Sequence, residues 1–287
     1  MKTKRCILCK RSKFVKVAQI GRTKIYECPH CKLAITDKVT GTKKKLYGTT
    51  KHYSPISVRT NIDKYVAKYE RIIERLSMFV SEGKVLDVGG GYGLFSALLS
   101  KEKSLEVTVL EPNLKPFFLE KSKGAKWVKR SFFKFRGRKR IYSVITFLDV
   151  LEHFKDPITT LHKTRELLRL NGYVVILVPN YRSTMRVLSR NWPWWMVEDN
   201  YFHFSRPSLK RILAQTGYRL KYLESFEDRT DFWFSLNGNF AKLKPVFVRK
   251  LVKVATLPFI FGIYLVLRPL LWKLYNGGLL LAIAQKK

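Results

Sequence analysis

A glycine-rich turn near residue 90 constrains the fold of this 287-residue chain more than any other feature of its sequence. An apolar run at residues 85–88 carries one acid, Asp87, and is followed by glycines at alternate positions, namely Gly89, Gly91 and Gly93. An apolar pattern with helical spacing begins directly afterwards, at Leu94. Glycines let a backbone come close to a bound ligand at points where a Cβ would collide with it. The stretch therefore predicts a buried strand, a tight turn against a ligand, and the start of a helix.

A second acid indicates that this ligand contains a nucleoside. The apolar run at residues 107–110 ends in Glu111, and an acid at the tip of a second parallel strand can accept hydrogen bonds from both hydroxyls of a ribose. A dinucleotide pattern, G-x-G-x-x-G, would need a glycine where Leu94 stands. Asp87 lies two residues before the first glycine, where a carboxylate would repel a pyrophosphate and hold a cationic amino-acid group.

The pattern D-x-G-x-G-x-G at residues 87–93 resembles motif I of the class I S-adenosylmethionine-dependent methyltransferases, and Glu111 matches the ribose-binding acid of their motif II. Residues 142–157 are similar to their fourth-strand motif, D-V-L-E-H-x-x-D-P, and residues 168–179 to their following helix end, glycine turn and fifth strand. The likeness covers residues 62–225, and the segment at residues 28–34 is similar to the C-x-x-C-G-L stretch that opens many methyltransferases of the broad type-23 group. It implies an α/β fold with a Rossmann-like, doubly wound, mostly parallel sheet, and S-adenosyl-L-methionine as the cofactor. A helix at residues 62–80 is expected before the first strand.

The same resemblance assigns the cofactor-binding residues, which are Asp87, Gly89, Gly91, Gly93, Glu111, Ser131 and Asp149. Ser131 stands where these enzymes usually carry an acid near the adenine amino group, and Ser143 replaces a common Asp before the fourth strand. A serine hydroxyl can still form a hydrogen bond with adenine. The adenine side of the site is therefore expected to be altered but functional.

Four cysteines near the start of the chain form two C-x-x-C pairs, which are Cys6 with Cys9 and Cys28 with Cys31. Four thiolates from two such knuckles close a tetrahedral zinc site, and the residues between the pairs suit a β-hairpin that turns at Gly21. We predict a zinc ribbon with a structural Zn²⁺ over residues 1–45 and a methyltransferase domain over residues 46–287. One alternative is a pair of disulfides, which a reducing cytoplasm disfavours. The other is a redox-active C-x-x-C pair, but no thioredoxin-like βαβ pattern surrounds either pair here.

Two histidines are candidates for the catalytic base. Methyl transfer from a sulfonium is an in-line displacement, so the enzyme aligns donor and acceptor and, for a hydroxyl acceptor, removes a proton. His153 follows the fourth strand and has a side chain suited to this work near neutral pH, although it can equally cap or orient its loop. His203 is the second candidate, and Asp149 is expected to touch the cofactor.

An aromatic loop at residues 191–205 resembles the lid of the same methyltransferase group. It contains three tryptophans within four residues, Trp192, Trp194 and Trp195. They are expected to stack against a ring of the acceptor, with ordinary packing beneath the loop as the alternative. Ser205 is a natural N-cap for a helix at residues 207–216.

A C-terminal apolar helical insert is expected at about residues 241–276, before a last strand at residues 279–284. Its uncharged core, residues 254–267, would reach only about 21 Å as a helix, which is short of a hydrocarbon core of about 30 Å. Extending it to Trp272 places Arg268 inside, and Pro258 and Gly262 weaken a straight span. We therefore expect a helix that lies in a membrane interface; a membrane span, a buried helix or a dimer face are the alternatives.

The net charge of +35 indicates a field that attracts phosphate, on nucleic acid or on an anionic bilayer. A lysine-rich host proteome would give the same count without a phosphate-bearing partner. Residues 1–16 are basic without an apolar signal core, so we expect a cytoplasmic protein, peripheral at the inner face of the membrane.

The leading hypothesis is a methyltransferase that acts on a small-molecule, glycan-type or lipid-linked acceptor. The alternative is an RNA methyltransferase that holds RNA through the ribbon and basic clusters, although the chain has no N-P-P-Y/F-like motif for planar base nitrogens. A non-catalytic ribbon-bearing binding module is the third hypothesis, and Asp87, the glycines and Glu111 argue against it.

Overall fold

The computed structural model describes residues 5–39, 62–102, 104–113, 124–189, 192–227, 232, 235–236, 238–240 and 244–287. The chain divides into two compact units. One, called the sheet unit here, is drawn from residues 39–178, 209–223 and 281–287. The other, called the ribbon unit, is drawn from residues 1–38, 179–208 and 224–280.

A seven-stranded sheet has the strand order β10-β11-β8-β7-β4-β5-β6. Its strands are β4 (Gly83–Val88), β5 (Leu105–Leu110), β6 (Lys126–Val128), β7 (Tyr142–Leu148), β8 (Leu168–Pro179), β10 (Tyr218–Phe226) and β11 (Leu279–Lys286). The pairs β4–β5, β5–β6, β4–β7 and β7–β8 are parallel. The chain order reverses between β4 and β7, which is where open α/β sheets bind ligands. The prediction of a Rossmann-like, mostly parallel sheet is confirmed.

Strand β11 runs against both of its neighbours. Past the end of β8, Asn180 N donates to Gly278 O at 2.7 Å, whereas near the start of β8 the side chain of Gln285 reaches Asn171 O at 3.3 Å. Beside β10, Lys287 N donates to Gly217 O at 3.1 Å. The expected last strand is therefore present and lies antiparallel between β10 and β8.

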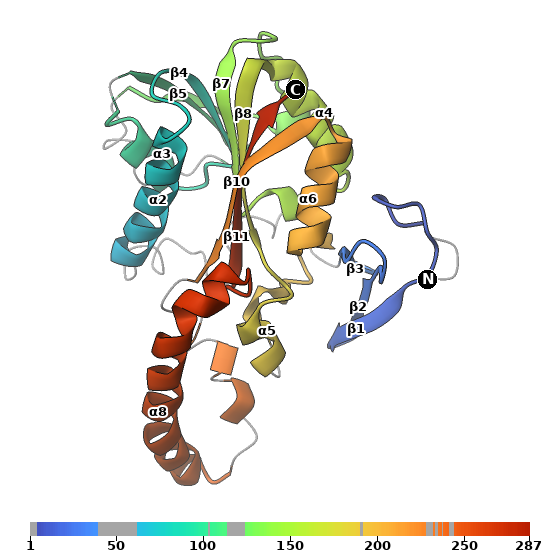
Figure 1. Cartoon of the computed structure of the whole chain (residues 1–287), viewed down its shortest axis with the longest axis vertical. Coiled ribbons are helices and arrows are strands. Elements are labelled where there is room, and N and C mark those ends of the chain that lie inside the picture. The colour runs from blue at the N-terminus through green and yellow to red at the C-terminus, as the bar shows by residue number, and fades with distance from the viewer. Residues whose placement is uncertain are drawn as a thin grey trace. The chain divides into compact units, whose positions relative to one another are not determined.

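Helices lie on both sides of this sheet, as the doubly wound prediction requires. Figure 1 shows α2 (Ile62–Ser77) and α3 (Leu94–Leu99) on one side and α4 (Pro157–Leu167) and α6 (Arg206–Gln215) on the other. The strands between them are apolar on both faces, as in β7, where only the last of seven residues is not buried. Helix α2 confirms the helix expected at residues 62–80 and ends three residues early, at Ser77.

Capping explains where α4 begins. Asp156 is the N-cap and its carboxylate accepts from Thr159 N at 3.0 Å, while Pro157 occupies the first turn. Further short helical elements include α5 (Thr184–Leu188) and the 3₁₀ turns η2 (Phe132–Lys134), η3 (Leu151–His153), η4 (Pro193–Trp195) and η5 (Gly238–Phe240).

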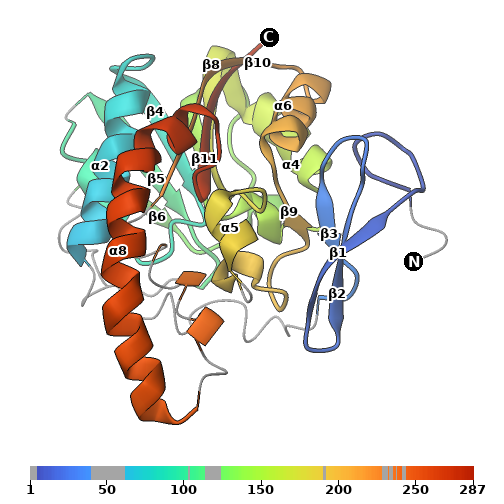
Figure 2. The same ribbon diagram turned by 60° about the horizontal axis from the view of Figure 1, so that its bottom comes forward.

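The N-terminal segment forms an antiparallel sheet with strands β1 (Val15–Ile20), β2 (Thr23–Glu27) and β3 (Ala34–Thr36). The hairpin turns at Gly21, whose φ of +58° suits glycine. A fourth strand, β9 (Phe202–His203), pairs antiparallel with β3, so a segment far along the chain completes the ribbon (Figure 2). No pattern in the sequence predicted this addition.

The apolar insert forms one long helix, α8 (Val246–Lys273), of 28 residues. At 1.5 Å per residue this helix measures about 42 Å, twice the length expected for the uncharged core alone, and Pro258 and Pro269 lie inside it. Within the described part of the chain, α8 is the single helix long and apolar enough to cross a membrane, with a mean hydropathy of 1.9 and 11% burial over its most apolar window.

Candidate active site

The glycine turn connects β4 to α3 in the left-handed backbone region. The φ angles are +74° at Gly89, +55° at Gly91 and +82° at Gly93. A Cβ added at Gly93 would lie 2.4 Å from the indole of Trp127, and one at Gly89 would lie 2.7 Å from the side chain of Val150. Only glycine satisfies both the backbone angle and the space. The turn therefore packs tightly between β6 and the loop that follows β7.

Asp87 lies beneath this turn and is only 2% exposed. Its two carboxylate oxygens accept from the hydroxyls of Ser96 and Thr146, each at 2.6 Å. Burial raises the pKa of Asp87, and these two hydrogen bonds oppose the rise. The carboxylate thus ties β4 to α3 and β7. Gly90 accommodates it, because a Cβ there would lie 2.9 Å from Asp87 Oδ2. The sequence had singled out neither Ser96, Thr146 nor Gly90.

Glu111 follows β5 and reaches the same turn. Its carboxylate accepts from Gly91 N at 3.2 Å and from Asn113 N at 2.8 Å. Burial raises its pKa, against the lowering effect of these backbone hydrogen bonds. A carboxylate has about four acceptor positions, so Glu111 retains capacity for a diol. The structure brings the two predicted motifs together through this one side chain.

Ser131 begins η2, in the loop that follows β6, and is partly exposed. The ammonium of Lys163, on α4, anchors this loop. It donates to the carbonyls of Phe132, Phe133 and Phe135 at 2.6, 3.1 and 2.9 Å. Lys163 therefore fastens the backbone directly after Ser131 to α4.

Asp149 follows β7 and has a φ of +56°, which is unusual for a residue other than glycine. Its carboxylate accepts from Lys68 Nζ, on α2, at 3.0 Å. The same ammonium lies 5.3 and 5.1 Å from the ring centroids of Tyr65 and Tyr69. Glu152 is 2% exposed, and burial, together with the charge of Asp149, raises its pKa well above the usual range. Asp149, and not the buried Glu152, is therefore the acid that pairs with Lys68.

His153 ends η3 in this same segment and is partly exposed. Its backbone N–H donates to Val150 O at 3.1 Å, and Val150 packs on Gly89. The sheet unit thus holds the glycine turn, Glu111, Ser131, Asp149 and His153.

His203 lies on β9 in the ribbon unit and is 3% exposed. Its Nε2 is 3.0 Å from the hydroxyl of Thr36, and its ring meets Trp195 edge-on with centroids 4.9 Å apart. Burial lowers its pKa to about 3. The imidazole is therefore neutral near pH 7 and embedded in the ribbon unit.

The tryptophans of the aromatic loop pack inside the ribbon unit. Trp192 and Trp195 are 2% and 4% exposed and share a core cluster with Ile25, Ala34 and Tyr181. Trp194 is half-buried against the same cluster. The expectation that all three stack on an acceptor is wrong for the two buried indoles, because ribbon residues already cover them.

The four cysteines converge, with all four sulfur atoms within 4.8 Å of one another. Cys6 Sγ lies 3.4 Å from Cys31 Sγ, and Cys9 Sγ lies 3.4 Å from Cys28 Sγ. These distances exceed an S–S bond of about 2.05 Å and are close to the sulfur separation in a tetrahedral site with metal–sulfur bonds of about 2.3 Å. The disulfide alternative is wrong for this structure, in which all four cysteines are free thiols. The cluster fits a metal ion, and a set of four thiolates suits a closed structural site.

Two of the comparisons with known proteins found matches. The profile of a family described as a methyltransferase domain, type 23, matches residues 61–223, which is more than half of the chain. A search of curated proteins found no match.

Solved structures with the same fold include three methyltransferases. Phosphoethanolamine N-methyltransferase 2 of Haemonchus contortus has a TM-score of 0.56 at 15% identity, over 82% of this chain and 58% of that one. A possible histamine N-methyltransferase of Thermotoga maritima has a TM-score of 0.51 at 13% identity, over 80% and 93%. A putative sarcosine dimethylglycine methyltransferase of Galdieria sulphuraria has a TM-score of 0.50 at 15% identity, over 77% and 86%. The family match and the glycine turn that Asp87 and Glu111 support lead to one conclusion: this chain belongs to the methyltransferase-domain family and is an S-adenosylmethionine-dependent methyltransferase.

Proposed function

We propose that this enzyme methylates a lipid-linked or glycan-type acceptor at the surface of an anionic membrane, as a peripheral protein on the cytoplasmic face. The observation that carries this proposal is the exposed apolar surface of α8. The exposed apolar side chains of this helix include Phe247 (71%), Val254 (73%), Phe259 (71%) and Val266 (79%).

The distribution of residues around α8 favours a helix lying along a membrane surface. Leu257 and Tyr264 are buried, and Phe232 and Leu236 pack against them. At about 100° per residue, the basic side chains of Arg249, Lys250, Lys253 and Arg268 fall on or beside this packed face. Up to the last turn, where Lys273 falls on the opposite side, more than half of the circumference is left apolar and uncharged. A helix with its charges along one side and apolar side chains on the other suits the interface between headgroups and acyl chains.

The basic residues near the end of the chain favour an anionic membrane surface over a neutral one. Residues 232–287 contain lysines and arginines but neither aspartate nor glutamate. Basic residues that flank an apolar segment each gain about 1 kcal/mol near an anionic bilayer. If no membrane covered it, the apolar face of α8 would expose far more hydrocarbon to water than a helix of a soluble protein usually does.

Residues of the sheet unit are proposed to hold the cofactor. Glu111 would accept from the ribose hydroxyls, Ser131 would bind adenine, and the backbone at Gly89, Gly91 and Gly93 would admit the amino-acid portion. Asp149 would bind the cofactor ammonium. Asp87, predicted from the sequence to bind the cofactor directly, is buried beneath the turn and bonded to Ser96 and Thr146, so we propose that it acts by keeping the turn in shape. When bound, S-adenosylmethionine supplies a methyl group on a cationic sulfonium.

His153 is proposed as the base for a hydroxyl acceptor. It is partly exposed and directly follows the segment that packs on the glycine turn, and a neutral imidazole can take up the proton near pH 7. The second candidate, His203, would need to protonate inside a buried cluster, which its lowered pKa of about 3 opposes.

The cysteine cluster is proposed to bind Zn²⁺ in a purely structural role, within a ribbon domain that ends near residue 45. That boundary lies outside the described residues.

RNA remains the second candidate acceptor. It is favoured by the net charge of +35 and by exposed basic side chains on the ribbon, Lys10, Arg11, Lys13 and Lys16.

A labelled-methyl experiment tests the proposed acceptor class. Cell extract is incubated with the enzyme and methyl-labelled S-adenosylmethionine, then separated into lipid, glycan, RNA and protein fractions. We expect label in the lipid or glycan fraction, and a loss of about tenfold or more for Val266→Asp. Leu170→Asp is the matched control, because Leu170 is similarly exposed (73%, against 79% for Val266) but lies on β8. Label in RNA that is insensitive to Val266→Asp would overturn the proposal.

A further inference from the structure

The second C-x-x-C turn of the ribbon, residues 28–33 and called the knuckle here, is joined by hydrogen bonds to the segment that follows β8. We call residues 180–205 the post-β8 segment; it runs from the end of β8 to the residue before α6. Ligands of parallel sheets lie beyond the carboxyl ends of the strands, so this segment begins where an acceptor is expected.

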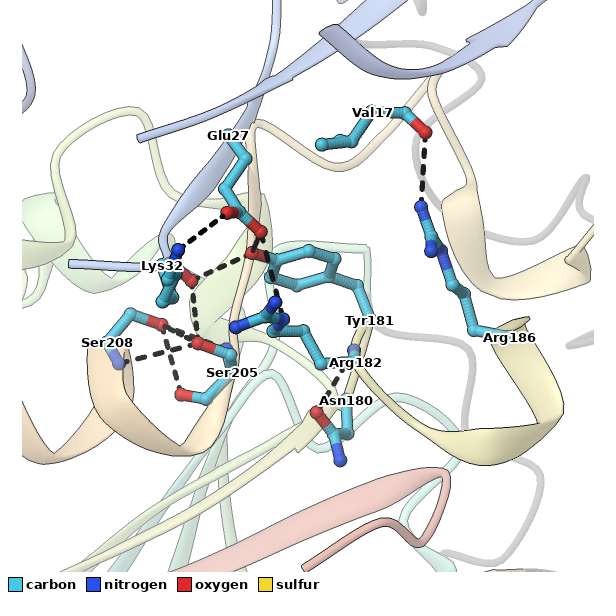
Figure 3. Close-up of polar contacts among 9 residues, drawn as sticks. All are labelled: Val17, Glu27, Lys32, Asn180, Tyr181, Arg182, Arg186, Ser205 and Ser208. Atoms are coloured by element: carbon cyan, nitrogen blue, oxygen red, sulfur yellow. Dashed lines mark hydrogen bonds and ion pairs between the residues drawn. The ribbon is translucent and has the colours of Figure 1, made fainter. Parts of the chain in front are cut away.

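One backbone carbonyl makes the central connection. Lys32 directly follows Cys31, and its carbonyl accepts from Tyr181 Oη at 3.0 Å and from Ser205 Oγ at 2.6 Å. Tyr181 and Ser205 are 1% and 0% exposed. Both ends of the post-β8 segment are therefore tied to a single atom of the knuckle, as Figure 3 shows.

The position of this carbonyl depends on the knuckle. Lys32 has a φ of +57°, a left-handed conformation that costs a residue with a Cβ about 1–2 kcal/mol. Its N–H donates to Cys28 O at 2.9 Å, and Cys28 N donates to Leu33 O at 2.9 Å. A metal bound by Cys28 and Cys31 would hold this turn closed against the cost of its backbone angle.

A buried acid reinforces the connection. Glu27 ends β2, is 8% exposed, and accepts from Tyr181 Oη at 2.6 Å. Lys32 Nζ lies 3.4 Å and Arg182 Nε 3.8 Å from its carboxylate. A buried carboxylate needs such partners, and here two of the three belong to residues at the start of the post-β8 segment.

Further contacts extend along the segment. Arg186 donates to Val17 O at 3.1 Å and lies over the Trp195 ring at 5.2 Å. Near the other end, the hydroxyl of Thr36 donates to Asn200 O at 2.7 Å, beside the pairing of β3 with β9. The ribbon therefore contacts the beginning, middle and end of the segment.

We infer that metal binding by the four cysteines positions the post-β8 segment, and thereby acceptor binding, while cofactor binding by the sheet unit does not require it. Glu27 and Tyr181 are the positioning residues that transmit the state of the knuckle. The acceptor part of this inference rests on the proposed function; the ordering of the segment by the metal does not.

Hydrogen–deuterium exchange on the full chain tests the inference, with S-adenosylhomocysteine binding measured by calorimetry on the same samples. The zinc-loaded protein is compared with chelator-treated protein and with Tyr181→Phe. We expect amides of residues 180–205 to exchange about tenfold faster or more after chelation. Tyr181→Phe should give a similar acceleration while retaining one bound zinc per chain.

Tyr218→Phe is the matched control, because Tyr218 is equally buried and donates to Leu161 O at 3.1 Å within the sheet unit. It should leave exchange of the segment unchanged. Affinity for S-adenosylhomocysteine should stay within about twofold in every sample that remains folded. Unchanged protection of residues 180–205 in both the chelated protein and Tyr181→Phe would overturn the inference and leave the ribbon as an independent module. Loss of cofactor binding in the zinc-loaded protein would instead count against the proposed function.

Discussion

The position and the interactions of single polar side chains in this enzyme depend on their burial and on one or two polar partners. Lys68 illustrates this: its side chain is 10% exposed, and its ammonium lies 3.0 Å from Asp149 and near two tyrosine rings. An ammonium and a carboxylate held side by side offer complementary charges to the carboxylate and ammonium of an amino acid. Lys68 is therefore a candidate partner of Asp149 in holding the amino-acid end of the cofactor.

Replacing Lys68 with methionine should weaken S-adenosylhomocysteine binding about tenfold, since a charge-assisted hydrogen bond contributes about 1.5–3 kcal/mol. Calorimetry of the purified variant measures this change. Lys84→Met is the control, because Lys84 also pairs with an acid, Glu106, but both side chains are largely exposed. An unchanged affinity in Lys68→Met would limit the pair to a structural role.

His203 makes a prediction about acid stability. Its pKa is about 3 in the folded protein against 6.5 ordinarily, so between these values the unfolded chain binds a proton that the folded chain excludes. The free energy of unfolding should therefore fall as the pH drops below 6.5, by about 1.4 kcal/mol per pH unit from this group. His203→Gln should remove that part of the pH dependence in urea unfolding between pH 4 and 7. His162→Gln, at an exposed position on α4, is the control and should leave this pH dependence unchanged. If the unfolding free energy falls equally steeply with pH in the unchanged protein and in both variants, His203 is not its source.

At the scale of elements, the glycine turn is specified by both backbone angle and space. Gly93→Ala would combine a φ of +82° with a Cβ 2.4 Å from Trp127, whereas Gly124→Ala would meet a φ of +108° with nothing within 4 Å. We expect Gly93→Ala to lose cofactor binding and about 2–4 kcal/mol of stability. Gly124→Ala should cost about 1–2 kcal/mol and retain binding. Similar losses in the two variants would show that space at the turn is unimportant.

Strands and helices of the sheet unit could be predicted from the sequence because their signals are local. The run at residues 85–95 combines an apolar strand, a glycine turn and a helix start, and the structure has β4, the turn and α3 at these positions. Each of these signals arises from neighbouring residues. The pairing of β3 with β9 joins Ala34 to His203, and a two-residue strand far along the chain carries no such local signal.

At the scale of the whole molecule, the proposed membrane association makes a prediction from charge and apolar surface together. Flotation with phosphatidylglycerol vesicles should show binding that weakens about tenfold between low salt and 0.5 M salt, because surface charges are screened. A residual, salt-resistant fraction should remain through α8 and disappear in Val266→Asp. Binding to RNA alone would fall throughout with salt. No vesicle binding at low salt, with steeply salt-dependent RNA binding, would favour the RNA acceptor.

The amino-acid sequence by itself determined the methyltransferase fold, the glycine turn, Glu111 at the end of its strand and the two C-x-x-C pairs, because each depends on residues close together in the chain. Tertiary structure alone decided that Trp192, Trp195 and His203 are buried, since the ribbon residues that cover them lie some 160 residues away in the chain. It also decided that Lys68 pairs with Asp149 and that Lys32 holds both ends of the post-β8 segment. Burial and hydrogen-bond partners are properties of the folded chain, and no local pattern of residue types specifies them.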